Sequence, residues 1–493
     1  WKINQFQLYI EHTFAWPSHP KIGKGYDPLT PGDIITIDKA CAKRHINFVP
    51  NLQSFGHQHH MLQRKEYAPL AETDMRWTLS PAEPGTYTLL DELFAEFLPN
   101  FRSTVFNIDS DETYDLGKGK SASMVAEKGL GCVYLDHILK LRDMAARYGR
   151  QIMFWGDIIL HHPELITSIP DDVTVLEWQY GEFPNEDHVR QFAEAGKKFY
   201  VCPGTNSWRA IFPRQQEARG NISRMAQYAI KYGAIGMLNT DWGDGGHFNL
   251  QGLSYYGYAF GAAESWNPGT TTDFDTAFGR LFFGPEDGAK VMEAMKHLET
   301  ITRPTAETFI ADIVMVHTGF LTGSSYREKL TPEVVAVMKS HAQQAFNLVK
   351  SLRGHTRHPL TISELYQAAY QDLLLAEKAE AAVNFHRQYA ELQAHGDSEG
   401  LTQLAKDTRK VLKALVIKAE KVPDIFAPLW HARARLAGLS ENIEYQMEVI
   451  EDLQASAEWI SKAVKTAKKA GMLPALPAID DHWEPKCMRA QVG

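Results

Sequence analysis

Three carboxylates stand where one short apolar run ends, within residues 106–112. Asp109, Asp111 and Glu112 follow side chains typical of a buried strand. Like charges held this close raise the pKa of at least one carboxyl group, which can then stay protonated near neutral pH. A protonated carboxyl beside an ionised one is suited to general acid and base catalysis. The alternative for the same residues is an acidic start to the following helix.

Aromatic side chains follow other strand-like runs in the first half of the chain. Trp155, Trp178, Trp208 and Trp242 each come soon after such a run. Tryptophan is seldom left fully in solvent, so such a residue is either part of the core or a stacking surface. Its flat face suits the apolar face of a sugar ring, and carboxylates beside it bind hydroxyls and transfer protons. The combination predicts a carbohydrate site.

The elements that position these residues are β-rich runs alternating with amphipathic stretches, a pattern typical of βα units around a parallel sheet. We expect strands over residues 3–9, 46–49, 104–108, 152–155, 173–178, 198–202 and 235–239. In a parallel barrel all strand carboxyl ends open on one face, where active sites lie. The sequence thus predicts an α/β fold, a (β/α)8 TIM-like barrel. Its eighth strand is either upstream of Trp1 or the weak run 77–79.

The pattern changes to long helices from about residue 331. Thr331 is a helix N-cap, Pro332 fits the first helical position, and apolar residues then recur every three or four positions as far as Leu352. Further helices are expected over 363–385, 399–421 and 441–469, in an all-α domain. We therefore divide the chain into a catalytic barrel, residues 1–325, and a helical domain, residues 326–493. The apolar stripe predicts a core, and a homodimer seam is a compatible alternative.

Composition excludes several classes of function. The net charge of −9 argues against a protein held to nucleic acid by phosphate neutralisation. No stretch reaches the roughly 20 uncharged apolar residues of a membrane span. The four cysteines are far apart, which signals neither a disulfide framework nor a cysteine zinc site. We expect a cytoplasmic protein, although a signal peptide upstream of Trp1 would not be visible in this sequence.

The motifs resemble those of one enzyme family. Asp111-Glu112 resembles the catalytic Asp-Glu pair of the glycoside hydrolase family 20 β-N-acetylhexosaminidases. The stretch 46–50 leading into Gly56-His57 resembles that family's Pro-Gly-His turn. Later strand ends are also similar, at Trp155-Gly156-Asp157, Trp178 and Trp242-Gly243-Asp244. The resemblance covers roughly residues 1–270 and implies a TIM barrel whose first strand is upstream of Trp1.

The resemblance implies an exo-acting, retaining enzyme that removes terminal β-linked GlcNAc or GalNAc from a glycan or glycoconjugate. Catalysis would be substrate-assisted, through an oxazolinium intermediate, without a metal or cofactor. Asp111 would orient the 2-acetamido group and stabilise its positive charge, and Glu112 would be the general acid and base. The residues expected to bind the substrate are His57, Trp155, Trp178, Tyr180, Asn206, Trp242 and Asp244.

The chain departs from the family pattern in three places. Asn107-Ile108-Asp109-Ser110 stands where the family has His-x-Gly-Gly, which indicates an unusual subtype. No Tyr-x-Asp follows the strand at 198–202, so Tyr180 and Asn206 are both candidates to orient the acetamido group. Asp244 replaces a Glu, which shortens the reach toward sugar hydroxyls. The choice between GlcNAc and GalNAc stays open.

Three other functions compete with this interpretation. One is a conventional retaining glycosidase with Glu112 as acid and base and Glu177 as nucleophile, which needs the two carboxyl groups about 5–5.5 Å apart. Another is a non-catalytic sugar-binding protein. The third is a metal-dependent hydrolase whose ligands come from a histidine-rich set: His12, His57, His59, His60 and Asp241.

Overall fold

The structure is a computed structural model that describes residues 1–269, 273–305, 312–323, 329–354 and 356–478. The chain forms two compact units. The sheet unit consists of Trp1–Gly204, Glu217–Thr240 and Phe260–Thr271, and the helical unit of Thr205–Gln216, Asp241–Ala259 and Thr272–Gly493. These units divide the chain at places other than residue 325. The domain boundary that the sequence predicts there stays a prediction.

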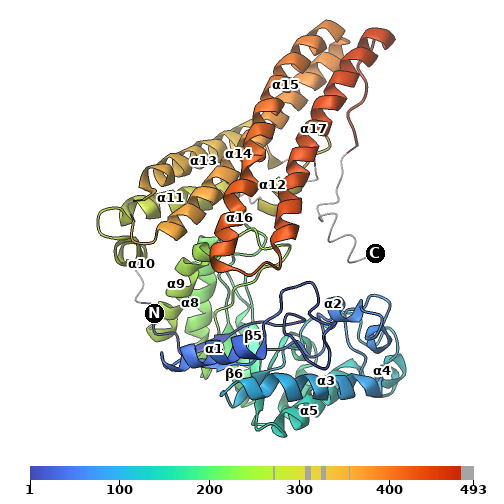
Figure 1. Ribbon diagram of the computed structural model, residues 1–493, viewed down its shortest axis with the longest axis vertical. Helices are drawn as coiled ribbons and strands as arrows, with labels where there is room; N and C mark the ends of the chain where they lie inside the picture. The colour runs from blue at the N-terminus through green and yellow to red at the C-terminus, as the bar shows by residue number, and fades with distance from the viewer. Residues whose placement is uncertain (270–272, 306–311, 324–328, 355, 479–493) are drawn as a thin grey trace. The chain divides into compact units, whose positions relative to one another are not determined.

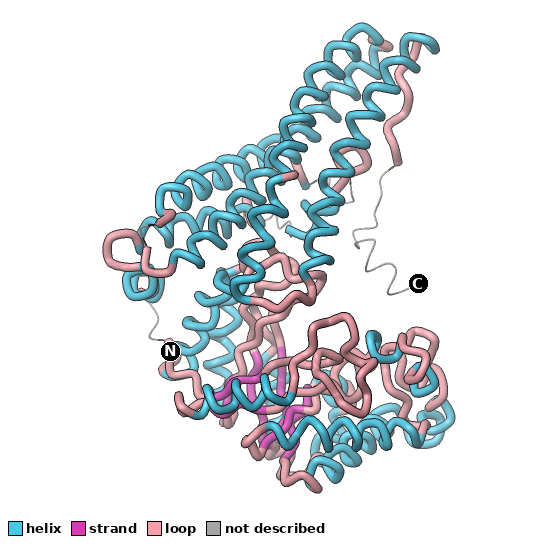
Figure 2. The backbone as a smooth tube through the Cα atoms, viewed as in Figure 1, coloured by secondary structure: helices cyan, strands magenta, loops and turns pink. Residues whose placement is uncertain are grey.

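All seven predicted strands are present, and every ladder is parallel. Figure 2 draws the strands in magenta. The strands are β1 (Gln5–Gln7), β2 (Asn47–Val49), β3 (Val105–Asn107), β4 (Gln151–Trp155), β5 (Thr174–Trp178), β6 (Lys198–Cys202) and β7 (Gly236–Met237). β1 pairs with β2, and β3 to β7 form a second sheet in chain order. A parallel bridge between Asn51 and Asn107 joins the two sheets. The result is a curled parallel sheet of the barrel type.

The weak run at 77–79 is not the missing strand. Leu79 forms only an isolated antiparallel bridge with Ala71, within a loop. A barrel strand would have to pair in parallel with a neighbour along the sheet. That half of the expectation is therefore wrong. Among the described residues no ladder joins β7 to β1, so the part of a barrel that the structure contains is open.

The two faces of the sheet differ in chemistry because successive strand residues point to opposite sides. Phe106, Phe154 and Val175 belong to the apolar core between strands and helices. The other face is polar at its centre, where the amides of Asn51 and Asn107 each donate to Gln7 Oε1 at 3.0 Å. The face of the sheet that points away from the helices therefore contains polar side chains.

Helices cover the apolar face of the sheet unit (Figure 1). They are α1 (Pro31–Ala42), α2 (His59–Leu62), α3 (Pro84–Phe97), α4 (Ala122–Lys128), α5 (Leu130–Ala146), α6 (Asp157–Leu160), α7 (Glu186–Glu194) and α8 (Gln215–Tyr232), with α9 (Tyr255–Trp266) following β7. Helix α1 begins with a capping box between Thr30 and Asp33, and Pro31 occupies its first turn. None of the described helices combines the length and the mean hydropathy that crossing a membrane requires.

The helical unit contains α10 (Phe274–Phe278), α11 (Gly288–Thr302), α12 (Asp312–His317), α13 (Pro332–Leu352), α14 (Pro359–His395), α15 (Ser398–Ala419), α16 (Lys421–Arg433) and α17 (Leu439–Ala470). Helix α13 begins as predicted, with the Thr331 hydroxyl accepting from the Val334 amide. The apolar stripe of α13 is buried, which confirms it as core. Helix α11 packs on α13, so helices that precede residue 326 share this unit.

Trp430 is buried inside the helical unit. Its ring packs with Leu250 and Phe426, and its indole N–H donates to the Arg435 carbonyl at 2.6 Å. The residue is an anchor within its own unit.

Candidate active site at the strand ends

The acidic loop after β3 is held in an unusual backbone conformation. Asp109, Ser110 and Glu112 all have positive φ angles, of 55°, 72° and 50°. Residues other than glycine adopt this left-handed region at a cost, and they do so mostly at functional sites. The Tyr134 hydroxyl donates to the Ser110 carbonyl at 3.0 Å and helps to fix the loop. Because of these φ angles, the backbone that carries the carboxylates does not continue as a regular helix.

Asp111 and Glu112 meet at one histidine. His57 Nε2 lies 3.3 Å from Asp111 Oδ2 and 3.3 Å from Glu112 Oε2. Its other nitrogen, Nδ1, lies 3.8 Å from Glu11 Oε1. The Gln53 side chain donates its amide to Asp111 Oδ1 and accepts from the Ser110 backbone N–H. Strands β1, β2 and β3 thus bring these residues together at their carboxyl ends, where the sequence placed Asp111, Glu112 and His57.

His57 is the positively charged member of this group. Burial alone would lower the pKa of His57, but hydrogen bonds to Asp111 and Glu112, with the charges of Asp111 and Glu11, raise it to about 11. Burial would raise the pKa of Glu11, yet the adjacent His12 side chain and the charge of His57 leave it lowered. The His57 ring is therefore an imidazolium at neutral pH.

Two further carboxyl groups lie next to the pair. Burial and the charge of Asp111 raise the pKa of Asp109 well above its ordinary value. The same two causes raise the pKa of Asp157 to about 7, and Asp157 Oδ2 accepts from the Glu112 backbone N–H at 3.0 Å. The cluster therefore contains carboxyl groups with very different proton affinities, which is the arrangement that acid and base chemistry requires.

Aromatic side chains support the loop. The Trp155 indole N–H donates to Asp109 Oδ1 at 2.7 Å, and Trp155 is only 2% exposed. Trp155 therefore holds the acidic loop in position, and its contact with a sugar stays a prediction. The Trp77 indole N–H donates to the Glu112 carbonyl at 2.7 Å, and its ring lies 4.5 Å from the His57 ring. The Trp77 ring therefore packs against the His57 ring.

Trp178 and Glu177 end β5 on opposite faces. Trp178 stacks on Tyr180 with ring centroids 5.1 Å apart, and its indole nitrogen has no hydrogen-bond partner among the described residues. Glu177 is buried beside helix α7, where its Oε1 lies 3.6 Å from His188 Nδ1 and accepts from the Gln179 amide. Glu177 shares a face with Val175, which packs on the helices. Its carboxylate is thus turned toward the helix layer.

The remaining predicted site residues belong to the helical unit. Asn206 is buried with a φ of 52°, and its carbonyl accepts from the Arg214 N–H. Trp242 is half-buried and Asp244 is exposed. The carboxylate of Asp241, between these loops, accepts hydrogen bonds from hydroxyls of its own unit: Thr205, Ser207, Ser254 and Tyr258. Whether Asn206, Trp242 and Asp244 act with Glu112 stays a prediction.

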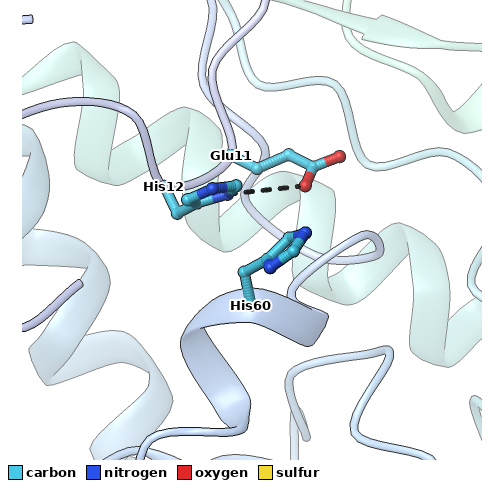
Figure 3. Close-up of side chains that lie close together, drawn as sticks. All are labelled: Glu11, His12 and His60. Atoms are coloured by element: carbon cyan, nitrogen blue, oxygen red, sulfur yellow. Dashed lines mark ion pairs between the residues drawn. The ribbon is translucent and has the colours of Figure 1, made fainter. Parts of the chain in front are cut away.

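The histidine-rich set divides. His12 and His60 lie together with Glu11, with donor atoms within 4.8 Å of one another (Figure 3). The donor atoms of His57, Asp111 and Glu112 lie within the same distance of one another. His59 contacts the Met75 carbonyl and Gln63 instead. Burial and the charge of His12 lower the pKa of His60 to about 4, so its imidazole is neutral at pH 7.

Some residues of the cluster escaped the sequence-based site. Gln53 and Glu11 follow strands like the other candidates, and Asp157 follows β4 within the motif Trp155-Gly156-Asp157. Their position after strands was a usable signal. Trp77 lies in a loop far from any strand end in sequence, so no pattern connects it with His57.

Removing the His57 charge is expected to change stability at alkaline pH. The folded pKa is raised, so protonation of His57 stabilises the fold fully below the unfolded value of about 6.5. That contribution is lost as pH rises toward 11, by up to about 1.4 kcal/mol per pH unit. His57→Asn, which tolerates the φ of 54° at this position, should flatten the fall. Urea unfolding between pH 6.5 and 10 tests this, and equal slopes for both proteins would contradict it.

Gly56 is required for the close approach of two loops. A Cβ atom at residue 56 would lie far inside van der Waals contact with the Asp111 carbonyl oxygen. Gly56→Ala should therefore displace the acidic loop and lower both activity and melting temperature. Gly181→Ala is the matched control, because nothing lies within 4 Å of its added Cβ. Similar behaviour of the two variants would contradict the expectation.

Comparisons with known proteins agree with the sequence motifs. Residues 3–234 match the family described as glycosyl hydrolase family 20, catalytic domain. A curated relative, hexosaminidase D of Bos taurus, is 24% identical over 191 residues, which is 36% of this chain and 54% of that protein. This chain thus spans about half the length of the curated relative it matches.

Two solved structures share the fold over most of the chain. A GH138 enzyme targeting pectin rhamnogalacturonan II has a TM-score of 0.55 at 10% identity, covering 96% of this chain and 63% of that one. A GH89 protein of Clostridium perfringens, in complex with its substrate GlcNAc-α-1,4-galactose, has a TM-score of 0.50 at 11% identity, covering 91% and 54%. At such low sequence identity, the likeness shows the fold alone. The resemblance found in the sequence is confirmed: residues 3–234 are similar to the glycosyl hydrolase family 20 catalytic domain.

Proposed function

We propose that the protein is an exo-acting, retaining β-N-acetylhexosaminidase that removes terminal β-linked GlcNAc or GalNAc from a glycan or glycoconjugate. The observation that carries the proposal is the meeting of Asp111 and Glu112 at His57 Nε2, each at 3.3 Å. The family match over residues 3–234 supports it. We also propose that the parallel strands belong to an eight-stranded (β/α)8 barrel.

Catalysis would be substrate-assisted. The 2-acetamido oxygen attacks the anomeric carbon while Glu112 gives its proton to the leaving oxygen, and a bicyclic oxazolinium ion forms. Asp111 holds the acetamido N–H and stabilises the positive charge that develops on the ring. Glu112 then takes a proton from water, whose oxygen attacks the anomeric carbon and reopens the oxazolinium. The configuration at the anomeric carbon is retained, and the protein supplies no nucleophile.

The surroundings of the pair suit these roles. Gln53 orients Asp111, and His57 holds both carboxyl groups in one place. The Trp178 indole nitrogen is buried and has no hydrogen-bond partner among the described residues, and we propose that it donates to a sugar hydroxyl when substrate binds. We also propose that Tyr180, which stacks on Trp178, acts with it.

The conventional retaining mechanism has weaker support. Its nucleophile would be Glu177, whose carboxylate is engaged by His188 and Gln179 on the helix side of β5. A nucleophile must instead lie about 5–5.5 Å from the acid and attack the anomeric carbon on the face opposite the leaving oxygen. Glu177 is better explained as a buried structural acid.

The decisive experiment compares two aryl β-glycosides that differ only at carbon 2. Substrate-assisted catalysis requires the acetamido group, so the 2-acetamido glucoside should be hydrolysed and the 2-hydroxyl glucoside should not. Equal rates would contradict the proposed mechanism, and hydrolysis of neither sugar would contradict the proposed activity. The matching galactosaminide then separates GlcNAc from GalNAc specificity.

A further inference from the structure

Glu11, His12 and His60 form a second group of polar side chains outside the proposed catalytic pair. One donor atom from each residue lies within 4.8 Å of the donor atoms of the other two. Glu11 and His12 come from the loop after β1, and His60 comes from the first turn of α2; the three side chains converge (Figure 3). We propose that this group, here called the EHH site, binds one Zn²⁺ ion.

The first support is a buried nitrogen that the protein itself does not satisfy. His12 is 8% exposed, and its Nδ1 has no hydrogen-bond partner among the described residues. This atom faces Glu11 Oε2 across 3.8 Å, too far for a hydrogen bond. A buried polar atom without a partner costs free energy, and a metal ion between the nitrogen and the carboxylate would satisfy both.

The second support is an outer layer of hydrogen bonds that fixes the ligands. The Tyr26 hydroxyl lies 3.1 Å from His60 Nδ1, and the Tyr9 hydroxyl donates to Glu11 Oε1 at 2.9 Å. Histidines that bind metals usually donate their other ring N–H to such a partner, which sets the tautomer. With Nδ1–H directed to Tyr26, the lone pair of His60 Nε2 is available. Glu11 likewise keeps Oε2 for the ion.

The donor set suits Zn²⁺. Two imidazoles and one carboxylate are borderline ligands that suit Zn²⁺, and three protein ligands leave a fourth position for water. His57, the cation that faces Glu11, is matched by Asp111 and Glu112. Glu11 and His60 are partly exposed, so an ion can enter from solvent.

The test is Zn²⁺ binding to the full chain after treatment with a chelator, measured by calorimetry and by melting temperature. We expect one ion per chain and a rise in melting temperature. His60→Ala should weaken binding at least 100-fold, and Tyr26→Phe should weaken it by about 10–100-fold, as the loss of an outer hydrogen bond does. The matched control is His59→Ala, one residue away on the same helix, which should bind as the unchanged protein does.

Glu112→Gln separates this group from the carboxylates around His57 and should leave Zn²⁺ affinity unchanged. Loss of binding in Glu112→Gln with binding kept in His60→Ala would overturn the proposal, because the ion would then belong to the catalytic pair. No binding at millimolar Zn²⁺, or an unchanged affinity in Tyr26→Phe, would also overturn it. The melting temperature of His60→Ala without metal verifies that it is folded. None of these measurements depends on glycosidase activity.

Discussion

Replacing Glu112 with Gln should lower kcat by roughly 10²–10⁴-fold while the protein stays folded, because the amide cannot give a proton to the leaving oxygen. The position tolerates the exchange: the loop is held by backbone contacts, in which the Glu112 N–H donates to Asp157 and its carbonyl accepts from Trp77. Neither contact uses the Glu112 carboxylate. A change of activity can then be assigned to chemistry.

The leaving group makes this test sharper. An aryl alcohol of low pKa leaves with little protonation, whereas a sugar alcohol needs the acid. Glu112→Gln should therefore lose far more activity on a disaccharide than on an activated aryl glycoside. The matched variant is Glu177→Gln, which should keep activity within a few-fold. Full activity of Glu112→Gln on the disaccharide, or inactivity of a folded Glu177→Gln protein, would contradict the assignment.

The meeting of Asp111, Glu112 and His57 was predictable because of how parallel strands are built. Buried strands appear in the sequence as short apolar runs, and their carboxyl ends share one edge of the sheet. Residues that follow β2 and β3 must therefore be neighbours, although 54 residues separate His57 from Asp111 in the chain. Only the order of the strands had to be correct for this.

The direction of a side chain was harder to predict than its position. Trp155 and Trp178 both end strands and gave the same signal in the sequence. One is buried with its indole N–H on Asp109, and the other keeps an unpartnered indole N–H beside Tyr180. The difference arises from the loop after β3, whose left-handed residues bring Asp109 over Trp155. Strain of this kind leaves no periodic trace in a sequence.

The division of the chain was hidden for a different reason. Loops after β6 and β7, residues 205–216 and 241–259, pack with the helical unit although they are close in sequence to strands of the parallel sheet. Asp241 gives the physical reason why the two loops stay together, because its carboxylate accepts hydrogen bonds from hydroxyls of both loops. Contacts between two polar loops have no apolar pattern that would predict them.

Cutting the chain after residue 325 should leave a fragment that aggregates or melts at a much lower temperature. Helix α11 lies before the cut, and its packing partner α13 lies after it. The cut would expose a buried apolar face of α11: Val291, Met295, Leu298 and Ile301. At roughly 1.5–3 kcal/mol for each such side chain, the loss is about 6–12 kcal/mol, which is comparable with the whole stability of a domain.

The measurement compares the fragment 1–325 with the full chain by size-exclusion chromatography and thermal unfolding, supported by two point variants of α11. Leu298→Ala leaves a cavity under α13 and should cost about 2–5 kcal/mol, whereas Lys296→Ala, on the exposed face of the same helix, should stay within about 0.5 kcal/mol. A soluble, monomeric fragment 1–325 that melts with the full chain would contradict the expectation. It would mean that α11 covers its apolar face without α13, and that residues 1–325 fold on their own, with the domain boundary that the sequence pattern predicts.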